Sequence, residues 1–275
     1  MDPYAAPYWV VLAMLGGAAM IAACAAHILF RRLVPYNKLV AHNDVAGFMI
    51  AVIGVIYAVL IAFVVIVVWE QYNDSDARYG DEVAAMADLD GYARTLPEPQ
   101  RTTVRTMVRH YIRLMIDDEW PAMRLGGESG AASQVLSDLA NAIEAPHPGG
   151  YRGALIQDQM VRALRTAADD RQRRLSDNQN TLPQVMWTAL LAGAVVTVGF
   201  GFLFGVANFR VQLAMTASVA MLIALSFTLL IELDFPFRRD AAIGADRWQY
   251  LQHTLGRAGS GAQAALTVGA VPARR

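Results

Sequence analysis

Four long apolar stretches constrain this chain more than any other feature of its sequence. They are Tyr8–Phe30, Val45–Trp69, Val185–Ala207 and Val211–Ile231, and His27 is their only Asp, Glu, Lys, Arg or His side chain. A helix that crosses a bilayer needs ~20 apolar residues, whereas a surface helix of a soluble protein carries a charged face. The sequence therefore predicts four transmembrane helices.

The composition agrees with a membrane protein and limits the classes of partner. Of the 275 residues 55% are hydrophobic and 17% are charged, and a net charge of −1 provides no basic field for nucleic acid. One cysteine, Cys24, excludes an internal disulfide and a Cys-based metal site. We expect the lipid bilayer as a partner, no nucleic-acid partner and no cofactor.

The first span has one alternative interpretation. Residues Ile21–Cys24 resemble a lipoprotein cleavage box. A signal peptide has a positively charged start and an apolar core of about 7–15 residues. This chain opens Met-Asp-Pro-Tyr and has a longer apolar run. We therefore expect a transmembrane helix at this position.

Between the second and third spans lies a polar region, Glu70–Leu182, with 18 acidic and 13 basic residues. Its apolar residues recur at helical spacing, and no run of alternating β-branched residues occurs, so we predict an all-α fold. One helix should begin after Pro99, and two more should cover Ala131–Ala145 and Tyr151–Asn178. The predicted divisions are residues 1–44 (first span and loop), 45–69 (second span), 70–182 (extramembrane helices), 183–237 (third and fourth spans) and 238–275 (a tail, disordered from about 256).

The polar residues match no enzyme motif. The five histidines form no metal-binding pair at helical spacing, and the loop Gly126–Gly130 is neither a nucleophile elbow nor a phosphate loop. The acidic run Asp117–Glu119 could bind a cation. However, consecutive helical positions point about 100° apart, which favours a solvated face. We expect neither an enzyme nor a metal site.

The second span continues without a proline or glycine break into Glu70–Asp74, which predicts one long helix that leaves the membrane. A charge-free helix of this kind is either lipid-facing or the wall of a hydrophobic constriction. Because the helix is apolar all round, periodicity does not choose between two candidate pore-lining rows, which are Ile53, Tyr57 and Ile61, and Val55, Val59 and Phe63.

Two tracts carry a resemblance to a known family. Phe63–Tyr72 is similar to the stretch of bestrophin channels in which an apolar pore helix ends in a Trp- and Tyr-containing segment, and Glu232–Phe237 is similar to their Glu and Pro-Phe segment. With His42–Asp44, Gly54, Tyr57 and Glu119–Pro121, the chain most closely resembles the bacterial bestrophin-like membrane family over roughly residues 30–240.

The resemblance implies a homo-oligomeric ion channel, a pentamer in bestrophins, whose second helices line one pore. It makes Trp69, Glu70 and Tyr72 candidates for the pore mouth, and the alternative is that they are anchors at the membrane interface, where Trp and Tyr gather in proteins of every function. Glu232 and Asp234 could form a cation clasp or a salt bridge with the arginines that follow. Calcium-responsive bestrophins carry an acidic cluster where this chain has Arg238–Asp240, so we expect no calcium gating. The alternative function is a membrane-anchored signalling or scaffold protein without a pore.

The charges near the membrane ends give opposing indications. Their totals favour cytoplasmic termini and a cytoplasmic polar region, as in bestrophins, whereas the first loop, with Arg31, Arg32 and Lys38, favours the reverse. These three cations, against Asp44, would attract anions to one mouth, whereas the acidic excess of Glu70–Leu182 would attract cations. The resemblance favours small anions and a bacterial inner-membrane location.

Overall fold

The chain forms two compact units in the computed structural model, which describes residues 7–35, 39–40, 42–145, 150–239 and 242–268, the last eleven by their backbone alone. We call Met1–Asn73 with Asn180–Ala242 the membrane unit. Asp74–Gln179 with Ile243–Arg275 is the polar unit. The described residues are helical apart from turns and connections and include no strand, which confirms the predicted all-α class.

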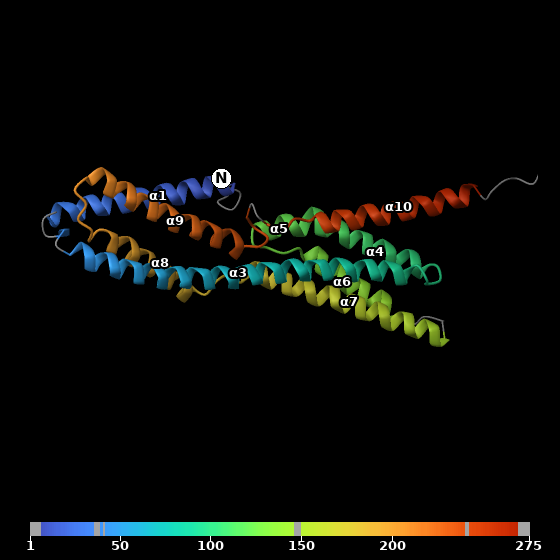
Figure 1. The fold of residues 1–275 in the computed structure, drawn as a ribbon. Coiled ribbons are helices and arrows are strands. Elements are labelled where there is room, and N and C mark those ends of the chain that lie inside the picture. Colours follow the sequence, from blue (N-terminus) through green and yellow to red (C-terminus); the bar gives the residue numbers. More distant parts are fainter. Residues whose placement is uncertain (1–6, 36–38, 41, 146–149, 240–241, 269–275) are drawn as a thin grey trace, which may run out of the picture. The chain divides into compact units, whose positions relative to one another are not determined.

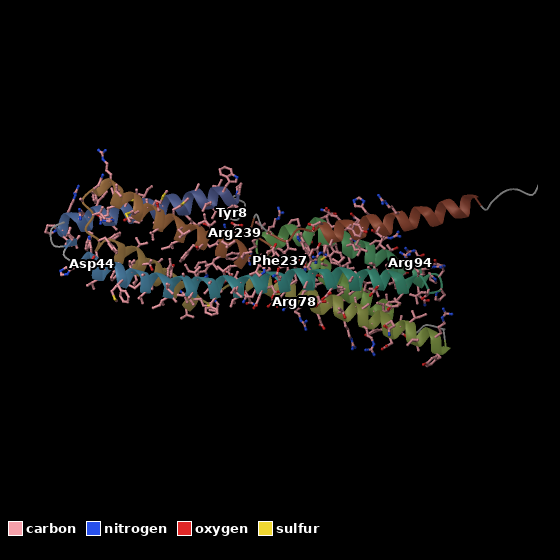
Figure 2. All side chains as sticks on the ribbon, viewed as in Figure 1. Tyr8, Asp44, Arg78, Arg94, Phe237 and Arg239 are labelled. Carbon is pink, nitrogen blue, oxygen red and sulfur yellow. The ribbon has the colours of Figure 1, made fainter. Side chains whose placement is uncertain are left out.

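Four helices of the membrane unit are long and apolar enough to cross a bilayer, as predicted. They are α1 (Tyr8–Leu33), the first part of α3 (Asn43–Ala93), α8 (Gln184–Gly201) and α9 (Phe209–Asp234) (Figure 1). In Figure 2 their side chains are mostly carbon, with nitrogen gathered around the end that holds Asp44. The predicted continuation of the second span into Glu70–Asp74 is confirmed, because α3 is one helix of 51 residues.

The third span ends earlier than predicted, at Gly201 instead of Ala207. The last turn of α8 tightens, since Phe202 N donates to Gly199 O at 3.1 Å. The chain then crosses close to the residues before α3. A Cβ on Gly205 would lie 2.7 Å from Val40 N, so this approach requires glycine. Apolarity alone therefore overestimated the length of the helix.

Helix α1 packs along α9, and a small residue and a polar pair mark their contact. A Cβ on Gly16 would lie 2.6 Å from Met221 Sδ, as expected for a packing glycine. Further along, His27 is fully buried with Nδ1 2.7 Å from Thr216 Oγ1, which itself donates to Gln212 O. Because that hydroxyl proton is already used, His27 Nδ1 is the donor to Thr216.

Helix α3 packs against α8 and the end of α9. Tyr57 is buried and its hydroxyl donates to Leu190 O at 3.1 Å. A Cβ on Gly193 would come within 2.5 Å of the Tyr57 ring, so glycine permits this close contact. A core of buried aliphatic residues continues the contact, formed by Val64, Val68, Leu182, Leu190, Leu230 and Leu233.

The polar unit consists of the second part of α3 and six further helical elements. In chain order these are α4 (Gln100–Leu114), the π-helix η1 (Met115–Glu119), α5 (Trp120–Arg124), α6 (Gly130–Glu144), α7 (Gly150–Gln179) and α10 (Asp246–Val268). The helices predicted after Pro99, at 131–145 and at 151–178 are therefore present with small shifts of their ends.

Helix α10 covers the beginning of the tail for which composition predicts disorder. Its backbone is helical to Val268, and residues 269–275 lie outside the described residues. Its first turn has strong contacts within the polar unit. Trp248 is fully buried and its backbone N donates to the Tyr79 hydroxyl at 3.1 Å, and Arg247 pairs with Asp76 at 2.7 Å. Composition alone did not reveal these anchoring contacts.

Candidate functional site

The structure separates the two candidate pore-lining rows of α3. In the first row Tyr57 is buried against α8, and Ile53 and Ile61 are partly covered. In the second row the exposed fractions of Val55, Val59 and Phe63 are 63%, 48% and 65%. The first row packs within the chain, and the second presents an apolar surface that the chain leaves open.

The candidate mouth residues follow on the same helix. Trp69 and Glu70 are exposed, whereas Tyr72 is partly buried against the core of the membrane unit. The rings of Trp69 and Tyr72 are stacked, with centroids 6.2 Å apart and an angle of 13° between the planes. This places an aromatic pair beside an exposed carboxylate at the end of the charge-free segment.

The acidic pair at the end of α9 is buried. Glu232 and Asp234 are 2% and 5% exposed, and Asp234 Oδ1 accepts a hydrogen bond from Leu182 N at 2.8 Å. The guanidinium carbons of Arg238 and Arg239 lie 5.6 and 5.7 Å from the centre of the Phe235 ring. Asp234 therefore holds the start of the segment that leads into α8. Among the described residues no group of three or more metal-ligating side chains occurs.

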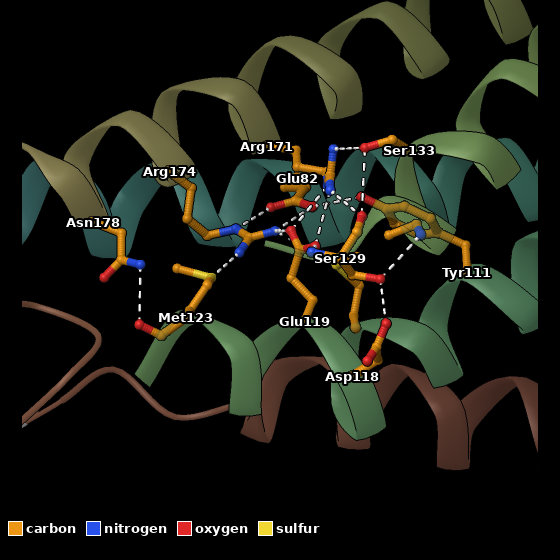
Figure 3. Close-up of polar contacts among 12 residues, drawn as sticks. Glu82, Tyr111, Asp118, Glu119, Met123, Ser129, Ser133, Arg171, Arg174 and Asn178 are labelled. Carbon is orange, nitrogen blue, oxygen red and sulfur yellow. Dashed lines mark hydrogen bonds and ion pairs between the residues drawn. The ribbon is translucent and has the colours of Figure 1, made fainter. Parts of the chain in front are cut away.

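A second cluster, which the sequence did not reveal, lies inside the polar unit (Figure 3). Arg174 of α7 is fully buried and donates through Nε and Nη2 to both oxygens of Glu82 of α3, at 2.7 and 3.1 Å. Its Nη2 also reaches Glu119 Oε1 at 3.2 Å, and its guanidinium lies 4.6 Å from the centre of the Trp120 ring. Tyr111 donates to Glu82 Oε1 at 2.9 Å. We call Glu82, Tyr111, Glu119, Arg171 and Arg174 the buried ion cluster.

Arg171 completes the cluster one turn earlier on α7. It donates through Nε and Nη2 to the two oxygens of Glu119, both at 2.9 Å, and through Nη1 to Ser133 Oγ at 3.0 Å. Ser129 N also donates to Glu119 at 2.9 Å, and the Ser129 hydroxyl donates to Asp118. Two arginines thus face two buried glutamates. The charges balance, which is the condition for burying ions in a protein interior.

Burial and the charge of Glu82 both shift the pKa values of Arg174 and Tyr111. Burial alone lowers the pKa of Arg174, but Glu82 raises it above the ordinary arginine range, so this side chain stays charged. Burial and then Glu82 raise the pKa of Tyr111 well above 10, so its hydroxyl stays protonated and donates. Arg174 therefore stays charged and Tyr111 stays protonated at neutral pH, and their hydrogen bonds to Glu82 tie α4 and α7 to α3.

The π-helical turn explains how Glu119 reaches the cluster. Trp120 N bonds to Met115 O, five residues back, and Pro121 follows with no N–H to donate. The solvated face predicted for Asp117–Glu119 is therefore wrong for Glu119, which is fully buried. The sequence signal that could have revealed the arginines is the buried stripe of α7, because Arg171 and Arg174 occupy core positions of a helical repeat: Met160, Leu164, Ala167, Arg171, Arg174 and Asn178.

One acidic residue near the cluster is less favourably placed. Asp170 is nearly buried. Its partner Arg173 is exposed, and Arg173 Nη1 lies 3.9 Å from Asp170 Oδ1. Burial, then the charge of Asp81, raises the pKa of Asp170 above its usual value. The ionised form of Asp170 therefore costs folding free energy at neutral pH.

Comparisons with known proteins concern the family and the fold. The family profile described as Bestrophin-like domain matches residues 5–247. The crystal structure of a bacterial bestrophin homologue from Klebsiella pneumoniae has a TM-score of 0.59 at 12% identity, over 86% of this chain and 96% of that chain. A point variant of the Klebsiella homologue has a TM-score of 0.62 at 14% identity, over 90% and 97%. At such identities the likeness shows a shared fold. No curated protein matches this chain.

Proposed function

Because the chain belongs to the bestrophin-like family, we propose that it is a homo-oligomeric ion channel of the bacterial inner membrane, with an apolar neck lined by α3. The observation that carries the proposal is the open apolar row Val55, Val59 and Phe63. This row lies on a helix without a charged side chain between Val45 and Trp69. Copies arranged around α3 would close such rows into stacked rings, and apolar rings gate ions by dewetting.

The row Ile53, Tyr57 and Ile61 fits the neck less well. Tyr57 is buried against Gly193 and bonded to Leu190 O within one protomer. Turning this row toward an axis would break that contact and leave a carbonyl and a hydroxyl without partners in an apolar region, which is costly. We therefore assign the neck to Val55, Val59 and Phe63.

Cysteine accessibility tests the assignment. In a Cys24→Ser background, cysteines at Val55, Val59 and Phe63 should react with small polar thiol reagents when the channel conducts. Cysteines at Ile53 and Ile61 should react more slowly, because the protomer partly covers these positions. Equal inertness of both rows in a conducting protein would exclude α3 as the pore wall.

Flux through purified protein in liposomes tests the function itself. Val59→Thr keeps the size of the side chain and adds a hydroxyl, so it should ease wetting of the neck and raise ion flux. Val195→Thr on α8 is the matched control, since Val195 is also exposed in the protomer but belongs to another helix. Absence of flux from the wild type, or equal effects of the two changes, would favour the scaffold alternative.

Glu70, beside Trp69 and Tyr72, is proposed as a charge at one pore mouth. Glu70→Gln should change the conductance or the ion preference, because a ring of carboxylates is removed near the neck. Glu128→Gln, an exposed change in the polar unit, is the control. If Glu70→Gln leaves both properties unchanged, Glu70 and its aromatic neighbours serve as interfacial anchors.

The proposed permeant ions are small anions, and the proposed topology has a cytoplasmic polar unit and cytoplasmic termini. The first-loop cations and the family support anions, whereas the acidic excess of Glu70–Leu182 opposes them. Reversal potentials in asymmetric potassium chloride decide whether the permeant ions are anions or cations. A shift toward the potassium equilibrium would overturn the anion proposal and leave the channel intact. The mass of the purified assembly counts the copies, for which the family suggests five.

A further inference from the structure

The membrane unit contains a cavity of about 280 Å³ that none of the proposed pore residues lines. Its wall comes from three helices, with Ile50 on α3, Thr197 and Val198 on α8, and Met215 and Val219 on α9. An apolar cavity of roughly 150 Å³ can hold a benzene molecule. The volume here is therefore sufficient for several methylene groups of an acyl chain.

The polar groups near this cavity are mostly bonded to other protein groups. Thr216, which lines it, donates to Gln212 O and accepts from His27. The Gln212 side-chain amide donates to Phe204 O. The Thr197 hydroxyl and Gln212 Oε1 have no hydrogen-bond partner. Both of these atoms are buried, so the wall offers mainly hydrocarbon surface.

The cavity lies at the end of the membrane unit where positive charge gathers. Val206 lines it, and Val206 O accepts a hydrogen bond from Arg31 Nη2 at 3.1 Å. The Arg31 guanidinium lies 5.7 Å from the centre of the Phe209 ring. Arg210 follows directly in the first turn of α9 and is exposed, as is Arg32. Asp44 is the only carboxylate among the described residues near this end, so cations predominate there (Figure 2).

We propose that this cavity with Arg31, Arg32 and Arg210 is a binding site for an anionic phospholipid. One acyl chain occupies the cavity, and the phosphate lies against the guanidinium groups, which suit phosphate geometry. Lipid tails surround the protein everywhere, so burial of the chain gives little preference by itself. The arginines select the headgroup, and the cavity fixes the position of the chain. This site is independent of the proposed neck.

The depth of the cavity agrees with a lipid that enters from the membrane surface. Thr197 lies four residues before the end of α8 at Gly201, which is ~6 Å along the helix axis. An ester group at the top of an acyl chain would reach this depth when the phosphate is at the arginines.

Photolabelling of the full-length protein in phosphatidylcholine vesicles tests the site. The probe is phosphatidylglycerol with a diazirine on its acyl chain, and labelled peptides are identified by mass spectrometry. Labels should concentrate on α8 and α9 around Val198 and Met215. Excess unlabelled phosphatidylglycerol should reduce them, and excess phosphatidylcholine should not. Equal competition by both lipids would overturn the proposal.

Two variants with matched controls complete the test. Val198→Phe fills the cavity and should abolish the labels, whereas Val195→Phe, at an exposed position of α8, should not. Arg210→Gln leaves the packing intact and should weaken the preference for phosphatidylglycerol about fivefold. Arg152→Gln in the polar unit should leave it unchanged. If the lipid probe does not label the cavity residues, and these residues instead cross-link to a second copy of the chain, the cavity belongs to the oligomer interface and the proposal is overturned.

Discussion

Removing Arg174 should destabilise the polar unit more than removing any exposed arginine of the same helix. In Arg174→Met, Glu82 keeps only the Tyr111 hydroxyl among its hydrogen-bond donors in the cluster, and it remains fully buried. Glu119 is affected less, because Arg171 still donates to both of its oxygens. The main cost is therefore one buried carboxylate that has lost its counter-charge.

The magnitude follows from the burial of both partners. Breaking a fully buried ion pair by removing one member costs about 3–5 kcal/mol. The loss of the contact with the Trp120 ring adds to this cost, and the methionine side chain recovers part of the packing. For a unit of this size such a cost corresponds to a fall in melting temperature on the order of 10 °C.

Thermal unfolding of the whole protein in detergent, followed by tryptophan fluorescence, measures this fall. Trp120 and Trp248 are buried in the polar unit and report on its opening. The matched control is Arg173→Met, the neighbouring position on α7, where the side chain is exposed and the change should cost at most about 1 kcal/mol. Equal melting temperatures for the two variants would refute the assignment of Arg174 as a structural tie.

A double variant separates the effect of the lost charge pair from the effect of the changed side-chain shape. Glu82→Gln alone leaves Arg174 facing a neutral amide, and Arg174→Met alone leaves a bare carboxylate. Combined, the two changes remove both charges. The loss of unfolding free energy in the double variant should therefore be smaller than the sum of the two single losses by about 0.5–3 kcal/mol. Strict additivity would mean that the two side chains do not interact.

Three further predictions concern other sites. Gly193→Ala should destabilise the membrane unit by about 1–3 kcal/mol, because its Cβ meets the ring of Tyr57, whereas Gly199→Ala, with no neighbour within 4 Å, should be tolerated in the same thermal assay. Asp170→Asn should raise the melting temperature at pH 7, and the gain should vanish as the pH falls below the ordinary value of 3.8, where the carboxyl is neutral in both folded and unfolded chains. Calcium and a chelator should leave liposome flux unchanged; a calcium response that Asp234→Ala abolishes would contradict this expectation.

The transmembrane helices and helix α4 were predictable because local patterns determine them. A charge-free run of more than 20 residues has few alternatives to a membrane span. The helix after Pro99 was equally clear, because its apolar residues recur at helical spacing, and its residues Val104, Val108 and Tyr111 are buried. The end of α8 was not predictable from apolarity, because the approach of Gly205 to Val40 is a tertiary contact.

The buried ion cluster could not be predicted as a cluster, because its members come from α3, α4, η1 and α7. Charged residues in a sequence are normally assigned to solvent, and that assumption hid Glu119. Two local features make the assumption wrong here. Arg171 and Arg174 occupy the buried stripe of α7, and a π-helical turn directs Glu119 toward them. An arginine at a core position of a helical repeat therefore predicts a buried acidic partner, although the sequence does not say which one.

The choice between the two rows of α3 shows why membrane helices are harder to orient from sequence than soluble ones. In water, the hydrophobic effect marks the packing face of a helix by its apolar residues. In lipid both faces are apolar, so the packing face is marked by small residues on the partner helix and by polar groups that need partners. On α3 the packing face is the one that carries Tyr57, because its ring packs on Gly193 and its hydroxyl donates to Leu190 O. The face opposite such marks is the one left for other copies, lipid or a pore, and on α3 that face carries Val55, Val59 and Phe63.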